Sequence, residues 1–152
     1  MKKLPDLQQL LGYKNPLVIE RFQQNVPGFS DSADQLFTDM LQYLWLSVKH
    51  EHDLEANPNN PDLQFVPVMH EEMRSIDNMW HEFILITLDY HAFCTHYFGD
   101  YLHHVPNMRE KLQFNEEELT NQLALFLNYI YEQLGEETLI RWFNEHLESE
   151  VA

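Results

Sequence analysis

The chain has 152 residues, of which 44% are apolar and 13% aromatic, so it is long enough to bury a core without disulfides. That apolar content argues against a disordered chain. Only nine Lys and Arg residues stand against 25 Asp and Glu residues, which gives a formal net charge of −16. Because Lys and Arg dominate binding to phosphates, we expect neither a nucleic-acid partner nor an anionic membrane partner.

Cysteine content and the first residues bear on the compartment. Cys94 is the only cysteine, so no internal disulfide can form and nothing indicates an oxidising environment. Lys2 and Lys3 are followed by Asp6 and further polar residues, which interrupt any apolar segment of the length that a signal peptide needs. We therefore expect no signal peptide, no transmembrane span and a cytoplasmic location.

Helical periodicity in the first half of the chain predicts an all-α fold. After a short apolar patch at 7–11, Asn15 and Pro16 favour a helix start, since Asn caps and Pro fits the first helical position. That helix is expected to run to about Asn25. A second start at 30–32 leads into a helix expected to end near Asp53. Its apolar stripe is Leu36, Met40, Leu44 and Val48.

The second half begins after a proline-rich loop at 55–67. Its apolar residues indicate that the loop packs against the surface of the domain and is not a free linker, so we place no domain boundary there. A helix is expected near 75–98, ended by Gly99, and apolar around most of its girth. Another follows Asn115 and ends at Gly135, and a last helix carries an apolar stripe over 139–147. We expect one compact domain, 1–152, built as a bundle of about five to six helices around the central 75–98 helix.

Histidines are concentrated in one part of the chain, with six of the nine between residues 70 and 104. Asp77 and His81 are four residues apart and share a helix face, where a carboxylate and an imidazole can bind one metal ion. His103 and His104 are the candidates for further ligands. The resulting hypothesis is a metal site of Asp77, His81, His103 and His104, with Zn or Fe as the candidate ions.

Helix geometry restricts that hypothesis. An unbroken helix from His81 to Gly99 would cover roughly 27 Å, while the residues from Gly99 to His104 span at most about 17 Å. Direct co-ligation therefore needs a kink near Thr87 or a ligand from another segment. A structural explanation stands beside the functional one: Asp77 favours the helix N-terminus, His81 is a buried histidine, and His103 and His104 pack a loop. We expect Cys94 to be an inert core thiol.

One stretch of the sequence is similar to a known family. It contains Asp77, Trp80-His81, Tyr90, Phe98-Gly99 and the turn His103-His104-Val-Pro106. This pattern resembles the glycine-rich domain-containing protein-like family, and in particular its short bacterial versions without the glycine-rich tail. The resemblance covers about a quarter of the chain. It implies a helical domain and a shared role for Asp77, Trp80, His81 and the histidine turn. It implies no activity, and Phe83 stands where plant members often have a second histidine.

Three functions follow from these observations. We favour a non-enzymatic protein-interaction or regulatory module, because the chain is acidic and aromatic and shows no nucleophile–base arrangement. The alternative is a metal-binding protein or metal-dependent enzyme that uses Asp77, His81 and His103 or His104, since a bound ion lowers the pKa of its water. An acidic decoy that mimics nucleic acid is disfavoured because the acids form no long blocks.

Overall fold

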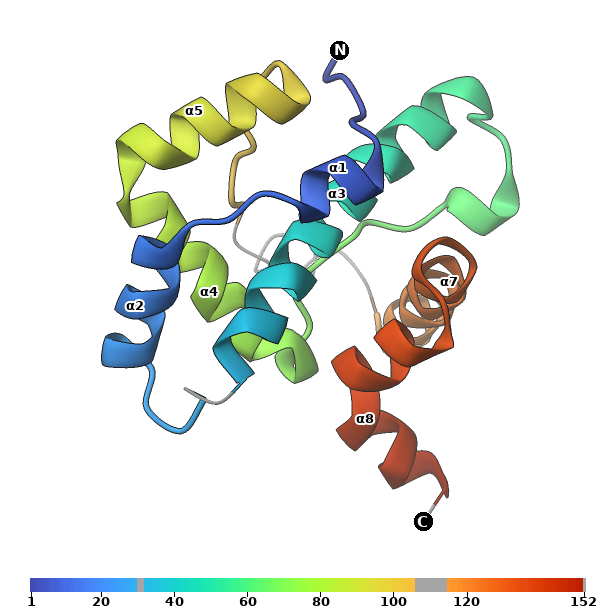
Figure 1. Ribbon diagram of the computed structural model, residues 1–152. Coiled ribbons are helices and arrows are strands. Elements are labelled where there is room, and N and C mark those ends of the chain that lie inside the picture. Colours follow the sequence, from blue (N-terminus) through green and yellow to red (C-terminus); the bar gives the residue numbers. More distant parts are fainter. Residues whose placement is uncertain (30–31, 106–114, 152) are drawn as a thin grey trace. The chain divides into compact units, whose positions relative to one another are not determined.

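The computed structural model describes residues 1–29, 32–105 and 115–151, and in this part of the chain it contains seven α-helices and no strand (Figure 1). The predicted all-α fold is confirmed. The helix count exceeds the expected five to six for two reasons. The apolar patch near the start forms a short helix of its own, α1 (Leu7–Leu11), and the expected central helix is two helices.

The helices form two compact units. The first consists of residues 1–48 and 73–102, and the second of residues 49–72 and 103–152. Helix α3 (Ala33–Ala56) contributes its first two thirds to the first unit and its end to the second. Each unit draws on both halves of the sequence, so no single cut in the chain separates them, and the single domain stays a prediction.

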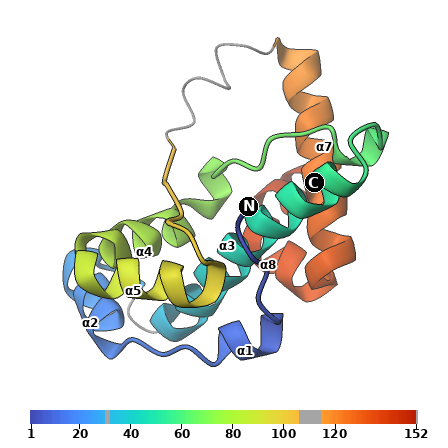
Figure 2. The ribbon, with the colours of Figure 1, turned by 90° about the horizontal axis from the view of Figure 1, so that it is seen from above.

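In the first unit, α2 (Pro16–Asn25), α4 (Arg74–Leu85) and α5 (Thr87–Phe98) pack with α4 against both of the others (Figure 2). Helix α2 begins where the sequence predicts, because the Asn15 side chain accepts a hydrogen bond from Val18 N at 3.3 Å and Pro16 needs no partner there. The core is made of large apolar side chains that are almost fully buried, among them Phe22, Phe37, Leu44, Phe83, Phe93 and Phe98.

The prediction of one helix over 75–98 is wrong. The backbone leaves the helical region at Ile86 (φ −89°, ψ 73°), where α4 ends and α5 begins. On a straight helix Phe83 and Phe93 would lie about 15 Å apart along the axis, but their ring centroids are 5.0 Å apart. The reversal buries both aromatic faces against each other, and this packing overrides the helical propensity of the sequence.

In the second unit, α7 (Glu116–Leu134) packs on α8 (Glu136–Val151) and on the 3₁₀ turn Pro61–Leu63. The predicted boundaries of α7 are confirmed: Asn115 Oδ1 accepts from Glu118 N at 2.8 Å, and Gly135 ends the helix with φ 94°. A second 3₁₀ turn, Glu71–Met73, leads directly into α4. Among the described residues, no helix combines the length and apolar character needed to cross a bilayer.

Candidate metal centre

Helix α4 carries the first two predicted ligands. Asp77 lies in its first turn and His81 one turn later, and Oδ1 of Asp77 is 3.5 Å from Nε2 of His81. The Asp77 side chain is 24% exposed and that of His81 is 51% exposed. The alternative of a buried His81 is therefore wrong, because the imidazole faces solvent. A partly exposed Asp–His pair at this distance contributes little to stability.

The position of Asp77 agrees in part with the structural explanation. The first turn of α4 has no side-chain cap on its N-terminal amides, because Met73 occupies the capping position. A carboxylate there interacts favourably with the helix dipole. That role requires only a negative charge near the helix start, and it does not require His81 at the same face.

A buried hydrogen-bond chain joins α4 to the segment that follows α5. Trp80 Nε1 donates to the Tyr90 hydroxyl at 2.9 Å, and that hydroxyl donates to the Leu102 carbonyl oxygen at 2.5 Å. Tyr90 is fully buried, and Trp80 and Leu102 are each 6% exposed. Trp80 is thus part of the core of the first unit. The reversal at Ile86 makes this chain possible, since it brings α5 back along α4.

The third ligand comes from the same anchored segment. His104 follows Leu102 by two residues, so it lies within about 7 Å of chain from the carbonyl that Tyr90 holds. Asp77, His81 and His104 each offer one ligand atom, and these atoms all lie within 4.8 Å of one another. They are the one such group of His, Cys, Asp or Glu side chains in residues 1–29, 32–105 and 115–143. His103 is exposed and is not part of this group, while His104 is half-buried.

These distances suit a first-row divalent ion after small side-chain adjustments. Nitrogen and oxygen ligands lie about 2.1 Å from Zn²⁺, so two of them on a tetrahedral ion are about 3.4 Å apart. The 3.5 Å separation of Asp77 and His81 already matches this value. Two imidazoles and one carboxylate would leave at least one coordination position for water. That donor set is typical of catalytic zinc and of non-haem Fe(II).

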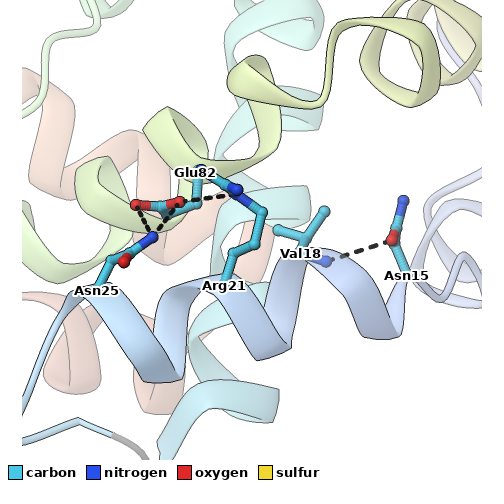
Figure 3. A network of polar contacts seen from close by, with 5 residues as sticks. All are labelled: Asn15, Val18, Arg21, Asn25 and Glu82. Carbon is cyan, nitrogen blue, oxygen red and sulfur yellow. Dashed lines mark hydrogen bonds and ion pairs between the residues drawn. The ribbon is translucent and has the colours of Figure 1, made fainter.

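A second polar network, which the sequence pattern did not indicate, fixes α4 against α2. Glu82 is an acidic residue of α4, yet it is only 9% exposed. Asn25 Nδ2 donates to its two carboxylate oxygens at 3.2 and 3.3 Å, and Arg21 Nε lies 3.3 Å from Oε2 (Figure 3). Because Glu82 follows His81 directly, this network also orients the helix that carries Asp77 and His81.

Cys94 is confirmed as a buried thiol in the same region. Burial raises its pKa, although hydrogen bonds involving the Leu102 backbone and the Tyr90 side chain lower it in part. A thiol with a raised pKa carries little thiolate at neutral pH. This agrees with the expectation of an inert core residue and leaves Cys94 out of the candidate ligands.

The second unit contains a polar cavity of about 240 Å³ near the end of α3. Asp53 on its wall accepts a hydrogen bond from the Tyr129 hydroxyl at 2.6 Å and forms an ion pair with Lys49 at 2.6 Å. Glu132 accepts from Asn128 at 3.3 Å. These two carboxylates are thus engaged by neighbouring side chains, and the cavity offers no grouping comparable to Asp77, His81 and His104.

Residues 64–134, a little under half of the chain, match the model of a family described as UCP032817-like. The matched segment contains Asp77, His81, His103 and His104 as well as Trp80 and Tyr90. No curated protein and no solved structure gives a significant match to the chain. The resemblance to the glycine-rich domain-containing protein-like family stays a prediction, because the matched description does not bear on it.

Proposed function

We propose that this protein binds one divalent transition-metal ion through Asp77, His81 and His104, with Zn²⁺ or Fe²⁺ as the candidate ions. The observation that carries the proposal is the grouping of one carboxylate and two imidazoles whose ligand atoms lie within 4.8 Å of one another. The formal charge of −16 adds support, because it raises the concentration of cations near the surface.

The chemistry of such an ion follows from its open position. Water bound there would have a lowered pKa, which permits a hydrolytic step for Zn²⁺, and Fe²⁺ with this donor set supports oxidative chemistry. Because the His81 imidazole is exposed, an ion bound to it would lie at the surface, where water and small ligands can reach it. We propose metal binding only, because the reaction depends on which ion the protein binds.

The test is the metal content of the purified, tag-free protein, measured by elemental mass spectrometry before and after incubation with Zn²⁺, Fe²⁺ or Mn²⁺. We expect close to one ion per chain for the wild type and a large loss for His81→Ala. His91→Ala is the matched control, because His91 is another exposed helical histidine but is not part of the group. It should keep the wild-type metal content.

Two results would refute the proposal. One is a wild-type protein that takes up none of the three ions. The other is a His81→Ala variant that keeps as much metal as His91→Ala. Circular dichroism of each variant shows whether the helices are intact, and His81→Ala should pass this check because its side chain is exposed.

The protein-interaction module is the second candidate function, and one observation favours it. Leu85 and Leu88, on either side of the break at Ile86, are 63% and 84% exposed. Neighbouring exposed leucines are a common element of protein contact sites. We propose a cytoplasmic protein partner for this function. If the α4–α5 corner is such a contact, Leu85→Ser with Leu88→Ser should abolish capture of the partner and leave metal content unchanged.

A further inference from the structure

We infer that Tyr90 is a positioning residue of the proposed metal site, because its hydroxyl ties the segment that carries His104 to the helix that carries Asp77 and His81. The inference rests on the proposed function. Tyr90 itself touches no ion in this account. It acts through Leu102, and it determines where the third ligand stands.

The hydroxyl of Tyr90 has one partner from each ligand-bearing segment, besides its contact with the Cys94 side chain. It accepts from Trp80 Nε1 at 2.9 Å, and Trp80 directly precedes His81. It donates to the Leu102 carbonyl at 2.5 Å, and Leu102 precedes His104 by two residues. One atom therefore links the side chain of the residue before the second ligand to the backbone two residues before the third.

The side chain that makes this link is buried. Tyr90 and Phe98 are fully buried, and Tyr90 packs at right angles against Phe83 at 5.0 Å and Tyr101 at 5.3 Å. Burial also raises the pKa of Tyr90, so the hydroxyl keeps its proton at neutral pH and is a donor to Leu102. A hydrogen bond shielded from water resists exchange with solvent more than an exposed one does.

The segment after α5 begins with a turn and is then held at Leu102. The helix ends at Gly99, whose φ of 71° turns the backbone out of α5. Leu102 is buried, while His103 and Val105 are exposed. The Tyr90–Leu102 bond thus fixes the backbone two residues before His104. Groups that orient metal ligands from outside the coordination shell change metal affinity by roughly 10–100-fold when they are lost.

The test compares Tyr90→Phe with Tyr129→Phe. Both substitutions remove one buried hydroxyl and keep the ring, but the Tyr129 hydroxyl donates to Asp53 and has no link to a proposed ligand. Zn²⁺ affinity is measured by calorimetry, and the visible absorption of bound Co²⁺ at saturation reports the coordination geometry. Hydrogen exchange of the metal-free protein reports the order of the segment around His104.

We expect Tyr90→Phe to bind Zn²⁺ at least tenfold more weakly than the wild type and to change the absorption per bound Co²⁺. We also expect faster hydrogen exchange at 102–105 and unchanged exchange at 77–81. Tyr129→Phe should match the wild type in all three measurements. If Tyr90 only stabilises the fold and does not position His104, Tyr90→Phe would lower the melting temperature but leave the spectrum of the Co²⁺-saturated protein unchanged. That result would overturn the inference.

The two proposals fail in different ways. A wild type that binds neither Zn²⁺ nor Co²⁺ contradicts the metal site itself. A wild type that binds, with Tyr90→Phe binding within twofold of it, contradicts only the role of Tyr90. If Tyr90→Phe does not fold, Trp80→Phe loosens the same hydroxyl from its other side and keeps an aromatic ring in place. Unchanged Zn²⁺ affinity and hydrogen exchange in Trp80→Phe would then overturn the inference.

Discussion

Glu82 joins α2 to α4, and its replacement by Ala should lower the free energy of unfolding by about 2 kcal/mol. The carboxylate is 9% exposed and receives two contacts from Asn25 and one from Arg21. A hydrogen bond to a charged group contributes about 1.5–3 kcal/mol net. The Arg21 side chain is 39% exposed, so its ion pair with Glu82 is screened by water and adds little.

The size of this effect is limited by what the partners do after the substitution. Asn25 is exposed, and the Arg21 side chain is 39% exposed although its Nε atom is buried. Because most of both side chains can turn to water, the loss should stay below the roughly 3–5 kcal/mol of a fully buried pair. Glu82→Gln keeps an acceptor for Asn25 and should cost about 1 kcal/mol. For a chain of this size, a loss of 2 kcal/mol corresponds to a fall in melting temperature of about 4–8 °C.

The assay is urea unfolding followed by circular dichroism at pH 7, with Glu20→Ala as the control. Glu20 lies on α2, is exposed and accepts only a 3.4 Å hydrogen bond from Gln24, so its replacement should change stability by less than about 0.5 kcal/mol. If Glu82→Ala unfolds at the same urea concentration as Glu20→Ala, the network in Figure 3 does not stabilise the contact between α2 and α4.

Two further predictions concern the cores of the two units. Trp80→Ala should destabilise the protein by about 3–5 kcal/mol, since the ring is 6% exposed and fills space beside Tyr43; a loss below about 1 kcal/mol in a urea melt would contradict this core role. His50 is buried and donates from Nε2 to the Leu63 carbonyl at 2.9 Å, and burial lowers its pKa from the ordinary 6.5. Below pH 6.5 the unfolded chain therefore binds a proton that the native His50 does not, so stability should fall as the pH drops toward the native pKa. His50→Asn should reduce this dependence between pH 7.5 and 5, and equal pH profiles for variant and wild type would exclude the contribution.

Local signals in the sequence predicted those features whose cause is local. Asn15 with Pro16, and Asn115 with Gly135, mark helix ends through caps and turns formed by adjacent residues, and the structure has them in place. The Asp77–His81 pair follows from helical spacing alone. The length of a straight helix likewise indicates that His81 and His104 can bind one ion only if the helix is broken near Thr87, and the break occurs at Ile86.

Features that depend on distant residues were not predictable in this way. No Gly or Pro marks the reversal at Ile86, because its cause is the packing of α5 aromatics on Phe83. Glu82 has the sequence pattern of a solvated residue, and it is buried because Asn25, 57 positions earlier, supplies its hydrogen bonds. The role of Tyr90 is similar, since its place on an apolar face indicates burial but not the identity of its partners.

The central claim, a metal ion held by one carboxylate and two imidazoles, is tested most directly by X-ray absorption spectroscopy of the Zn²⁺-loaded protein. We expect the Zn²⁺ ion to have nitrogen and oxygen ligands at about 2.0–2.1 Å, with the outer-shell scattering of two imidazoles. The His104→Ala protein should show the scattering of one imidazole. A wild-type spectrum with only oxygen ligands, or one that His104→Ala leaves unchanged, would contradict the account.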